Sequence, residues 1–131
     1  MPASIFLFIA ACSGFIAVAL GAFGAHGLKG RLAPYLMDVF QTGVQYQFYH
    51  TLALLLVAVL VLRQNGRTLR IAGWSFTLGM VLFSGSLYLL ALTGTHWLGA
   101  VTPVGGLAFL TGWAALAYSA LQLSRNPNNA D

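Results

Sequence analysis

The sequence predicts an all-α integral membrane protein with four transmembrane helices in a compact bundle. Three observations support this prediction: 59% of the 131 residues are hydrophobic, only 6% are charged, and the apolar residues gather into four long runs. A soluble domain carries about a quarter charged residues, so six basic and two acidic side chains cannot cover a surface that faces water. We therefore expect residues 1–131 to form one domain whose main solvent is the lipid bilayer.

Each apolar run has the length of one membrane crossing, since a helix needs about 20 residues to cross a hydrocarbon layer of about 30 Å. Backbone polar groups left open in lipid are costly, which leaves helices as the expected structure. The runs predict helices over residues 4–23, 43–62, 71–92 and 104–123, followed by a polar tail at 124–131.

The first run carries one helical face made only of small residues, at steps of four, three, four and three: Ala10, Gly14, Ala17, Gly21 and Gly24. Small faces let helix backbones approach closely, and close packing is a main force of association in lipid. A cleaved signal sequence is the alternative for this run. It would not need such a face, however, and no Lys or Arg precedes the apolar residues.

The fourth run begins after Thr102-Pro103, which is typical of a helix start, with Thr as N-cap and Pro at the first helical position. It carries a second face of small residues: Gly105, Ala108, Gly112, Ala115 and Ser119. We expect both faces to be helix–helix contacts, within one protomer or across an oligomer. The alternative is chance, because Gly and Ala are common in membrane helices.

The second crossing is preceded by residues 34–45, which predict an amphipathic interfacial helix that leads into the membrane. Pro34 can open this helix, and Asp38, Gln41 and Gln45 lie opposite its apolar side chains.

The second crossing itself contains an unusual polar stretch. Its apolar run, residues 51–62, is only twelve residues long, so Gln45, Gln47 and His50 must enter the membrane with it. At about 1.5 Å per residue, His50 lies roughly 20 Å from Arg63, well inside the hydrocarbon. An ionisable side chain at that depth is a functional-site candidate by default.

Three interpretations of this stretch stay open. In the first, His26 and His50 bind loop carbonyls and tie the first two helices together. In the second, His50 handles a proton or a ligand, since an imidazole changes its charge near neutral pH. The third is a metal site built from His26, His50 and His96 with Asp38, but the spacing lacks the usual ligand pairs. We expect no catalytic residue, no metal and no cofactor.

The basic residues lie at the ends of the apolar runs, as membrane anchors do, and are not clustered as nucleic-acid binding requires. They are Lys29, Arg31, Arg63, Arg67, Arg70 and Arg125. Four of the six lie on the side that holds both termini and two on the other side. The positive-inside rule therefore favours cytoplasmic termini.

Three stretches resemble one known family: GAFGAHGL at residues 21–28, QTGVQYQFYH at 41–50 and LGAVTPVGG at 98–106. Together they look like the YgdD-like family of small bacterial inner-membrane proteins, which has an animal transmembrane relative. The resemblance implies a four-helix protein of the inner membrane and brings no established activity. It carries over, without assigned roles, the family-pattern residues His26, Gln41, Gln45, Tyr46, Gln47 and His50.

Two functions are compatible with these features. The first is a non-enzymatic scaffold or accessory subunit that packs through its small-residue faces, as a homo-oligomer or with a membrane-protein partner. The alternative is a small transporter or channel-like protein with a polar site around His50, Gln47 and Tyr46.

Overall fold

The structure is a computed structural model, and it describes residues 2–125. Of the polar tail expected at 124–131, residues 126–131 lie outside the described part. The elements in chain order are α1 (Pro2–His26), α2 (Pro34–Arg63), α3 (Arg67–Gly79), the π-helical turn η1 (Met80–Ser84), α4 (Gly85–Thr93), the 3₁₀ turn η2 (His96–Ala100) and α5 (Thr102–Arg125).

Four helical spans are long and apolar enough to cross a membrane, as the sequence predicts: Pro2–His26, Pro34–Arg63, Arg67–Thr93 and His96–Arg125. The third span is one continuous helix in which η1 joins α3 to α4. Its end at Gly94 has a left-handed conformation (φ 69°), which glycine adopts without strain. All four spans extend beyond the predicted apolar runs at both ends.

Helix α2 is unbroken for 30 residues, so the amphipathic stretch at 34–45 and the second crossing are one rod. At about 1.5 Å per residue the rod is roughly 45 Å long, about the thickness of a bilayer with its headgroups. Gly43 lies inside the rod, where it provides space for a neighbouring side chain. A Cβ atom there would come within 2.8 Å of the Tyr88 ring.

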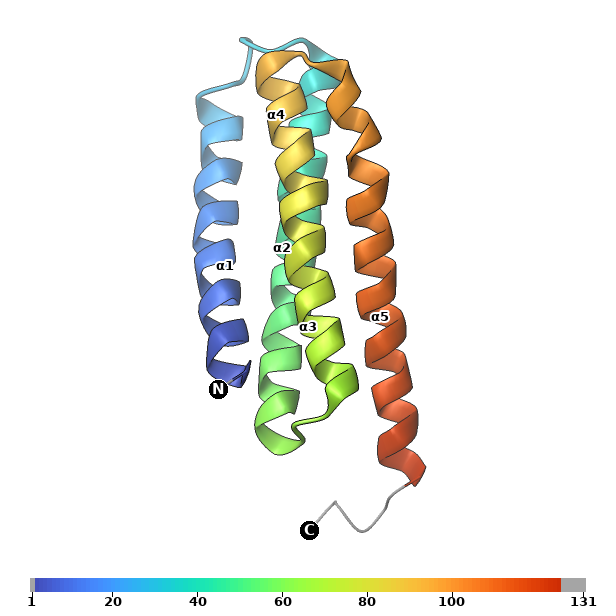
Figure 1. Ribbon diagram of the computed structural model, residues 1–131. Helices are drawn as coiled ribbons and strands as arrows, with labels where there is room; N and C mark the ends of the chain where they lie inside the picture. Colours follow the sequence, from blue (N-terminus) through green and yellow to red (C-terminus); the bar gives the residue numbers. More distant parts are fainter. Residues whose placement is uncertain (1, 126–131) are drawn as a thin grey trace.

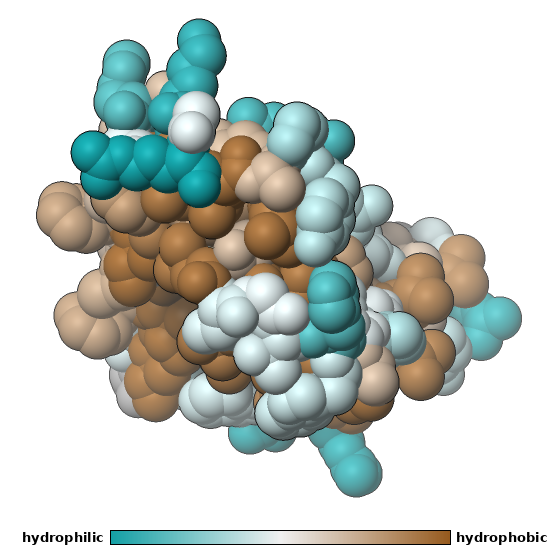
Figure 2. Space-filling model, turned by 90° about the horizontal axis from the view of Figure 1, so that it is seen from above, coloured by the Kyte–Doolittle hydropathy of each residue, from teal (hydrophilic) through white to brown (hydrophobic). Residues whose placement is uncertain are grey.

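The third span and α2 form the centre of the molecule, and α1 and α5 lie at opposite edges (Figure 1). Consecutive spans run in opposite directions, so Pro2, the α2–α3 turn and Arg125 share one end. Figure 2 shows the other end, where hydrophilic side chains stand at the margin beside a broad hydrophobic surface.

Both small-residue faces lie inside the protomer, but they do not meet each other. On α1, Gly14, Gly21 and Gly24 face Thr51, Val44 and Phe40 of α2, respectively, and Ala10 and Ala17 are buried along the same face. On α5, a Cβ atom at Gly105 would overlap the backbone of Phe83 in η1, and one at Gly112 would meet the Phe76 ring of α3. Ser119 is buried, and Ala108 and Ala115 are half-buried.

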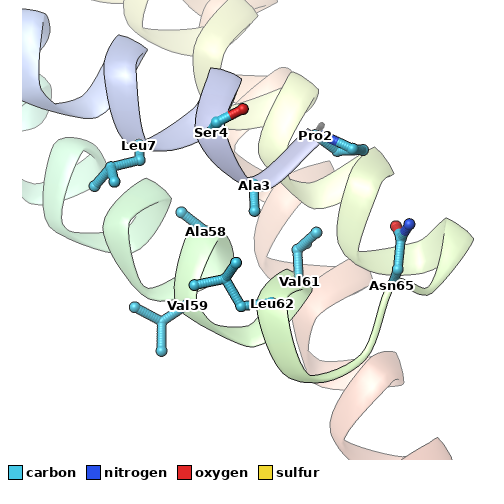
Figure 3. A pocket seen from close by; sticks show the side chains of 9 residues that line it. All are labelled: Pro2, Ala3, Ser4, Leu7, Ala58, Val59, Val61, Leu62 and Asn65. Carbon is cyan, nitrogen blue, oxygen red and sulfur yellow. The ribbon is translucent and has the colours of Figure 1, made fainter.

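Large apolar side chains cover the outside of the molecule, as expected for a surface in lipid; Phe15, for example, is 78% exposed. A shallow groove of about 530 Å³ lies between the start of α1 and the end of α2 (Figure 3). Side chains such as Leu7, Val59 and Leu62 make its lining almost wholly apolar. Ser4 and Asn65 are the polar residues of this lining.

Candidate functional site

Four polar side chains meet in the middle of the membrane span and form what we call the polar network: Ser13 of α1, Gln47 and Thr51 of α2, and Tyr88 of α4. The Tyr88 hydroxyl donates to Gln47 Oε1 over 2.6 Å. Gln47 Nε2 donates to the Ser13 carbonyl oxygen over 3.0 Å and to Ser13 Oγ over 3.2 Å. Ser13 Oγ lies 2.7 Å from Thr51 Oγ1. The network therefore joins three of the four spans.

Each hydroxyl of the polar network has an acceptor within reach. Thr51 donates to the Gln47 carbonyl oxygen one turn earlier, over 2.8 Å, and the Met80 sulfur lies 3.4 Å from Ser13 Oγ, so the Ser13 hydroxyl can donate to Thr51 or to Met80. The amide of Gln47 then uses both N–H groups and its oxygen, which is its main hydrogen-bonding capacity. Gln47 is 7% exposed, Ser13 9% and Thr51 2%. A buried amide placed in this way is satisfied without water.

Local helix geometry brings these side chains together. Gln47 and Thr51 are four residues apart, so they lie one above the other on the same side of α2. Ser13 stands between the buried residues Ala10 and Ala17 on the face that α1 turns to α2. The π-helical turn precedes Tyr88, and its last residue, Ser84, donates to the carbonyl oxygen of Gly43 over 2.7 Å. A π-turn inside an α-helix is often found at a functional site.

His50 lies on another side of α2, against α5. Its Nε2 accepts a hydrogen bond from the indole N–H of Trp113 over 3.1 Å. Because an indole nitrogen can only donate, the hydrogen of the imidazole is on Nδ1, which donates to the Tyr46 carbonyl oxygen over 2.7 Å. The ring stacks on Phe109, with centroids 3.5 Å apart and an angle of 8° between the planes. Both ring nitrogens are thus occupied, and the tautomer is fixed.

The first of the three interpretations, in which His26 and His50 tie the first two helices together, does not match the contacts of His50. His50 connects α2 to α5, and the link between α1 and α2 runs through Ser13, Gln47 and Thr51. The reason is geometric: at 3.6 residues per turn, His50 lies about 60° to one side of Gln47 around α2 and Thr51 about 40° to the other, so Thr51 turns to α1 and His50 to α5.

Comparison with known proteins identifies the family. A family described as "Protein of unknown function (DUF423)" matches residues 20–106. The UPF0382 inner membrane protein YgdD of Escherichia coli K12 is 47% identical, over 95% of each chain. The UPF0382 membrane protein YwdK of Bacillus subtilis is 44% identical, over 90% of this chain and 97% of its own. The chain belongs to the DUF423 family. No solved structure matches it significantly.

The names of the two relatives give a membrane location, and the family description gives no activity. Both agree with the resemblance noted in the sequence. The DUF423 match contains Gln47, Thr51 and Tyr88 of the polar network, whereas Ser13 and Trp113 lie outside the matched residues. The part of the site on α2 and α4 is thus within the recognised family region, and its partners on the two edge helices are not.

The other family-pattern residues do not converge on the site. His26, Gln41 and Gln45 are exposed, and His26 lies at the end of α1. Tyr46 is 39% exposed and contacts the site at His50, through its carbonyl oxygen and through its ring, whose centroid lies 6.0 Å from that of the imidazole. Of the six candidate residues, only Gln47 and His50 are buried.

The convergence of three histidines that a metal site would need is not present. Residues 2–125 contain no group of three His, Cys, Asp or Glu side chains able to hold a metal ion. His96 is exposed at the end of the molecule, where it stacks on Tyr35, and both nitrogens of His50 are already hydrogen-bonded.

Two membrane-facing grooves reach the site. One, of about 360 Å³, lies between α1 and the third span and touches Ser13, Gln47 and Tyr88. The other, of about 570 Å³, lies between α2 and α5 and is lined by His50, Trp113 and other mainly aromatic and aliphatic side chains. Both linings are almost entirely apolar.

Sequence reasoning missed Ser13, Thr51, Tyr88 and Trp113 as members of the site. Serine and threonine are common in membrane helices, where they bond to their own backbone, so their presence alone indicates little. One feature of the sequence points to these missed residues: a buried Gln47 needs hydrogen-bond partners on neighbouring helices. The sequence does not, however, give the rotation of those helices.

Proposed function

We propose that this DUF423 protein is a non-enzymatic membrane protein of the bacterial inner membrane that acts as a scaffold or accessory subunit. One observation carries the proposal: among residues 2–125, no buried side-chain nitrogen or oxygen lacks a hydrogen-bond partner. A site that binds and releases a polar substrate needs groups that change partners. Here the amide of Gln47 and the imidazole of His50 are held by the protein itself.

The small transporter is the second candidate, and one observation favours it. The groove of about 360 Å³ between α1 and the third span reaches Ser13, Gln47 and Tyr88. If α1 moved away from the third span, this groove would admit water to the polar network.

Accessibility of Ser13 to water separates the two candidates. We would replace the natural Cys12 by alanine and introduce Ser13→Cys, with Asn65→Cys and His96→Cys as controls at the two ends of the molecule. Both control residues are exposed. Right-side-out and inside-out vesicles would be treated with a charged thiol reagent that requires water. The scaffold predicts labelling of both controls, each from one side, and no labelling of Ser13→Cys until detergent unfolds the protein.

Labelling of Ser13→Cys in intact vesicles would instead favour the transporter. Proteoliposome flux gives the second measurement: the scaffold predicts equal, background flux of protons and small cations for wild type, Gln47→Ala and His50→Ala. A wild-type flux that either substitution abolishes would overturn the scaffold proposal.

A further inference from the structure

Helix α2 turns a row of polar side chains outward, away from the rest of the protomer. Gln41, Gln45 and Tyr49, at steps of four residues, form what we call the α2 polar stripe. All three are exposed, Tyr49 to 55%. Their side chains form no hydrogen bond with any of residues 2–125. These residues belong to the motif that resembles the family, and the polar network makes no use of them.

The neighbouring helix shows how deep the α2 polar stripe lies. The apolar run of α1 ends at Phe23, and the next residue, Gly24, lies against Phe40 of α2. The edge of the hydrocarbon is therefore near residues 40 and 41 of α2. Gln45 and Tyr49 are about 6 Å and 12 Å deeper, at about 1.5 Å per residue.

Lipid chains cannot satisfy these groups. An amide or phenol without a hydrogen bond is costly in hydrocarbon, and polar side chains in membrane helices accordingly bond across helix contacts. Gln41 can reach the headgroup region, but Gln45 and Tyr49 need a protein partner. That partner must offer both donors and acceptors at the same depth.

A second copy of the same helix meets this requirement. A glutamine amide carries donors and an acceptor, and a tyrosine hydroxyl can do both, so the stripe is complementary to itself. Two parallel copies related by a two-fold axis along the membrane normal place equal depths opposite each other, as an isologous contact requires. The same face continues as an exposed apolar row, Leu52, Leu56 and Val59, toward the other end of α2.

We infer that the α2 polar stripe is a self-association surface, where α2 of one protomer contacts α2 of a second copy. Gln45 and Tyr49 donate and accept hydrogen bonds across the two-fold axis. The inference does not depend on whether the protein acts as a scaffold or as a transporter, since the stripe lies outside the polar network.

Association in vesicles tests the inference. Labelled protein would be reconstituted at several protein-to-lipid ratios and its dimer fraction measured by energy transfer between copies. We expect a wild-type dimer, and about a tenfold weaker association for the double variant Gln45→Leu, Tyr49→Phe, from the loss of two or more hydrogen bonds in lipid. Thr111→Leu on the exposed face of α5 is the matched control and leaves association unchanged. Its hydroxyl bonds only its own helix, at Leu107.

Because these side chains make no hydrogen bond within the protomer, the double variant should unfold at the wild-type temperature when both proteins are diluted in detergent until they are monomeric, which separates loss of association from loss of fold. A monomeric wild type, or a double variant that associates as strongly as wild type, overturns the inference.

Disulfide trapping locates the contact. In a Cys12→Ala background, Gln45→Cys should form a disulfide-linked dimer on oxidation with copper phenanthroline. Phe15→Cys, at a lipid-exposed position of α1 (78% exposed), should not. Equal trapping at both positions, or cross-linking of Gln45→Cys to a different protein, contradicts a specific contact between copies.

Discussion

Gln47 shows how a single polar residue can be placed in the membrane interior without binding anything from outside. Its amide donates twice to Ser13 and accepts once from Tyr88. Each bond goes to a different helix from its own, so the residue specifies how α1 and α4 are rotated relative to α2. An apolar residue would fill the same space but would leave those rotations to packing alone.

Replacing Gln47 by leucine should destabilise the protein by about 1–3 kcal/mol, because the Tyr88 hydroxyl and the Ser13 carbonyl lose their partner in a buried place. Tyr88→Phe removes one hydrogen bond and should cost about 0.5–1 kcal/mol. Unfolding in mixed micelles with increasing SDS measures both. Thr111→Val, on the lipid-exposed face of α5, is the control. A Gln47→Leu variant as stable as this control would contradict the role of the polar network.

The contact between His50 and Trp113 predicts an uncommon histidine tautomer. With the indole N–H directed at Nε2, the His50 ring should carry its hydrogen on Nδ1. Nitrogen-15 NMR of labelled protein at neutral pH distinguishes a protonated from an unprotonated ring nitrogen. In Trp113→Phe the donor is lost, and Nε2 should become protonated in a measurable fraction of molecules. Protonation at Nε2 in the wild type would contradict the geometry.

For single residues, the sequence predicts how deep a side chain lies in the membrane better than it predicts the hydrogen-bond partners of that side chain. The short apolar run at 51–62 indicates that Gln47 and His50 lie inside the membrane, and both are buried in the structure. Their partners, Ser13 and Trp113, depend on the rotation of α1 and α5, which a sequence pattern leaves open.

Among the glycines that the structure describes, Gly105 at the start of α5 comes closest to the backbone of another helical element, the π-helical turn η1. A Cβ atom at Gly105 would overlap the backbone nitrogen of Phe83 and lie 2.8 Å from its Cα. Backbone cannot move aside as a side chain can, so only glycine fits at this position. Gly106, the next residue, has only the far edge of the Phe83 ring nearby, at 3.9 Å.

This pair of neighbouring glycines provides a matched test. Gly105→Ala should destabilise the protein by about 1–3 kcal/mol through overpacking, whereas Gly106→Ala should be nearly neutral or slightly stabilising. Both substitutions have the same effect on intrinsic helix propensity, so their difference reports the helix contact. Equal unfolding free energies in micelles would show that α5 does not approach η1 this closely.

The small-residue pattern predicts which faces of α1 and α5 are packed, but the identity of the partner helix comes only from the structure. Gly14, Gly21 and Gly24 lie against α2, and Gly105 and Gly112 against the third span. A stripe of glycine and alanine shows that some backbone comes close. It contains no feature that selects one neighbour over another, or a neighbour within the protomer over one in a second copy.

For the whole molecule, length and composition are sufficient to predict four helical crossings, because the bilayer imposes both the length and the polarity of each. Length and composition do not predict how these crossings are arranged relative to one another. The central position of α2 and the third span, with α1 and α5 at the edges (Figure 1), follows from packing detail that composition does not contain.

The orientation in the membrane is a prediction for the whole molecule. Arg63, Arg67, Arg70 and Arg125 lie at the end of the molecule where α1 begins and α5 ends, and Lys29 and Arg31 lie at the other end. We expect the first end in the cytoplasm. In intact cells whose outer membrane has been made permeable, a charged thiol reagent should label His96→Cys and not Asn65→Cys, both in a Cys12→Ala background. The reverse pattern would show the opposite orientation.

We expect the bonds between Ser13 and α2 to matter also when the chain enters the bilayer during synthesis. Helix α1 is the most apolar of the four spans and leaves the ribosome before α2, so we expect it to insert without help from α2. Helix α2 follows with polar residues that hydrocarbon disfavours, and Ser13 is then already in place to receive the Gln47 amide. On this account α1 acts as an insertion partner for α2, and the order of the helices along the chain is part of how the protein is made.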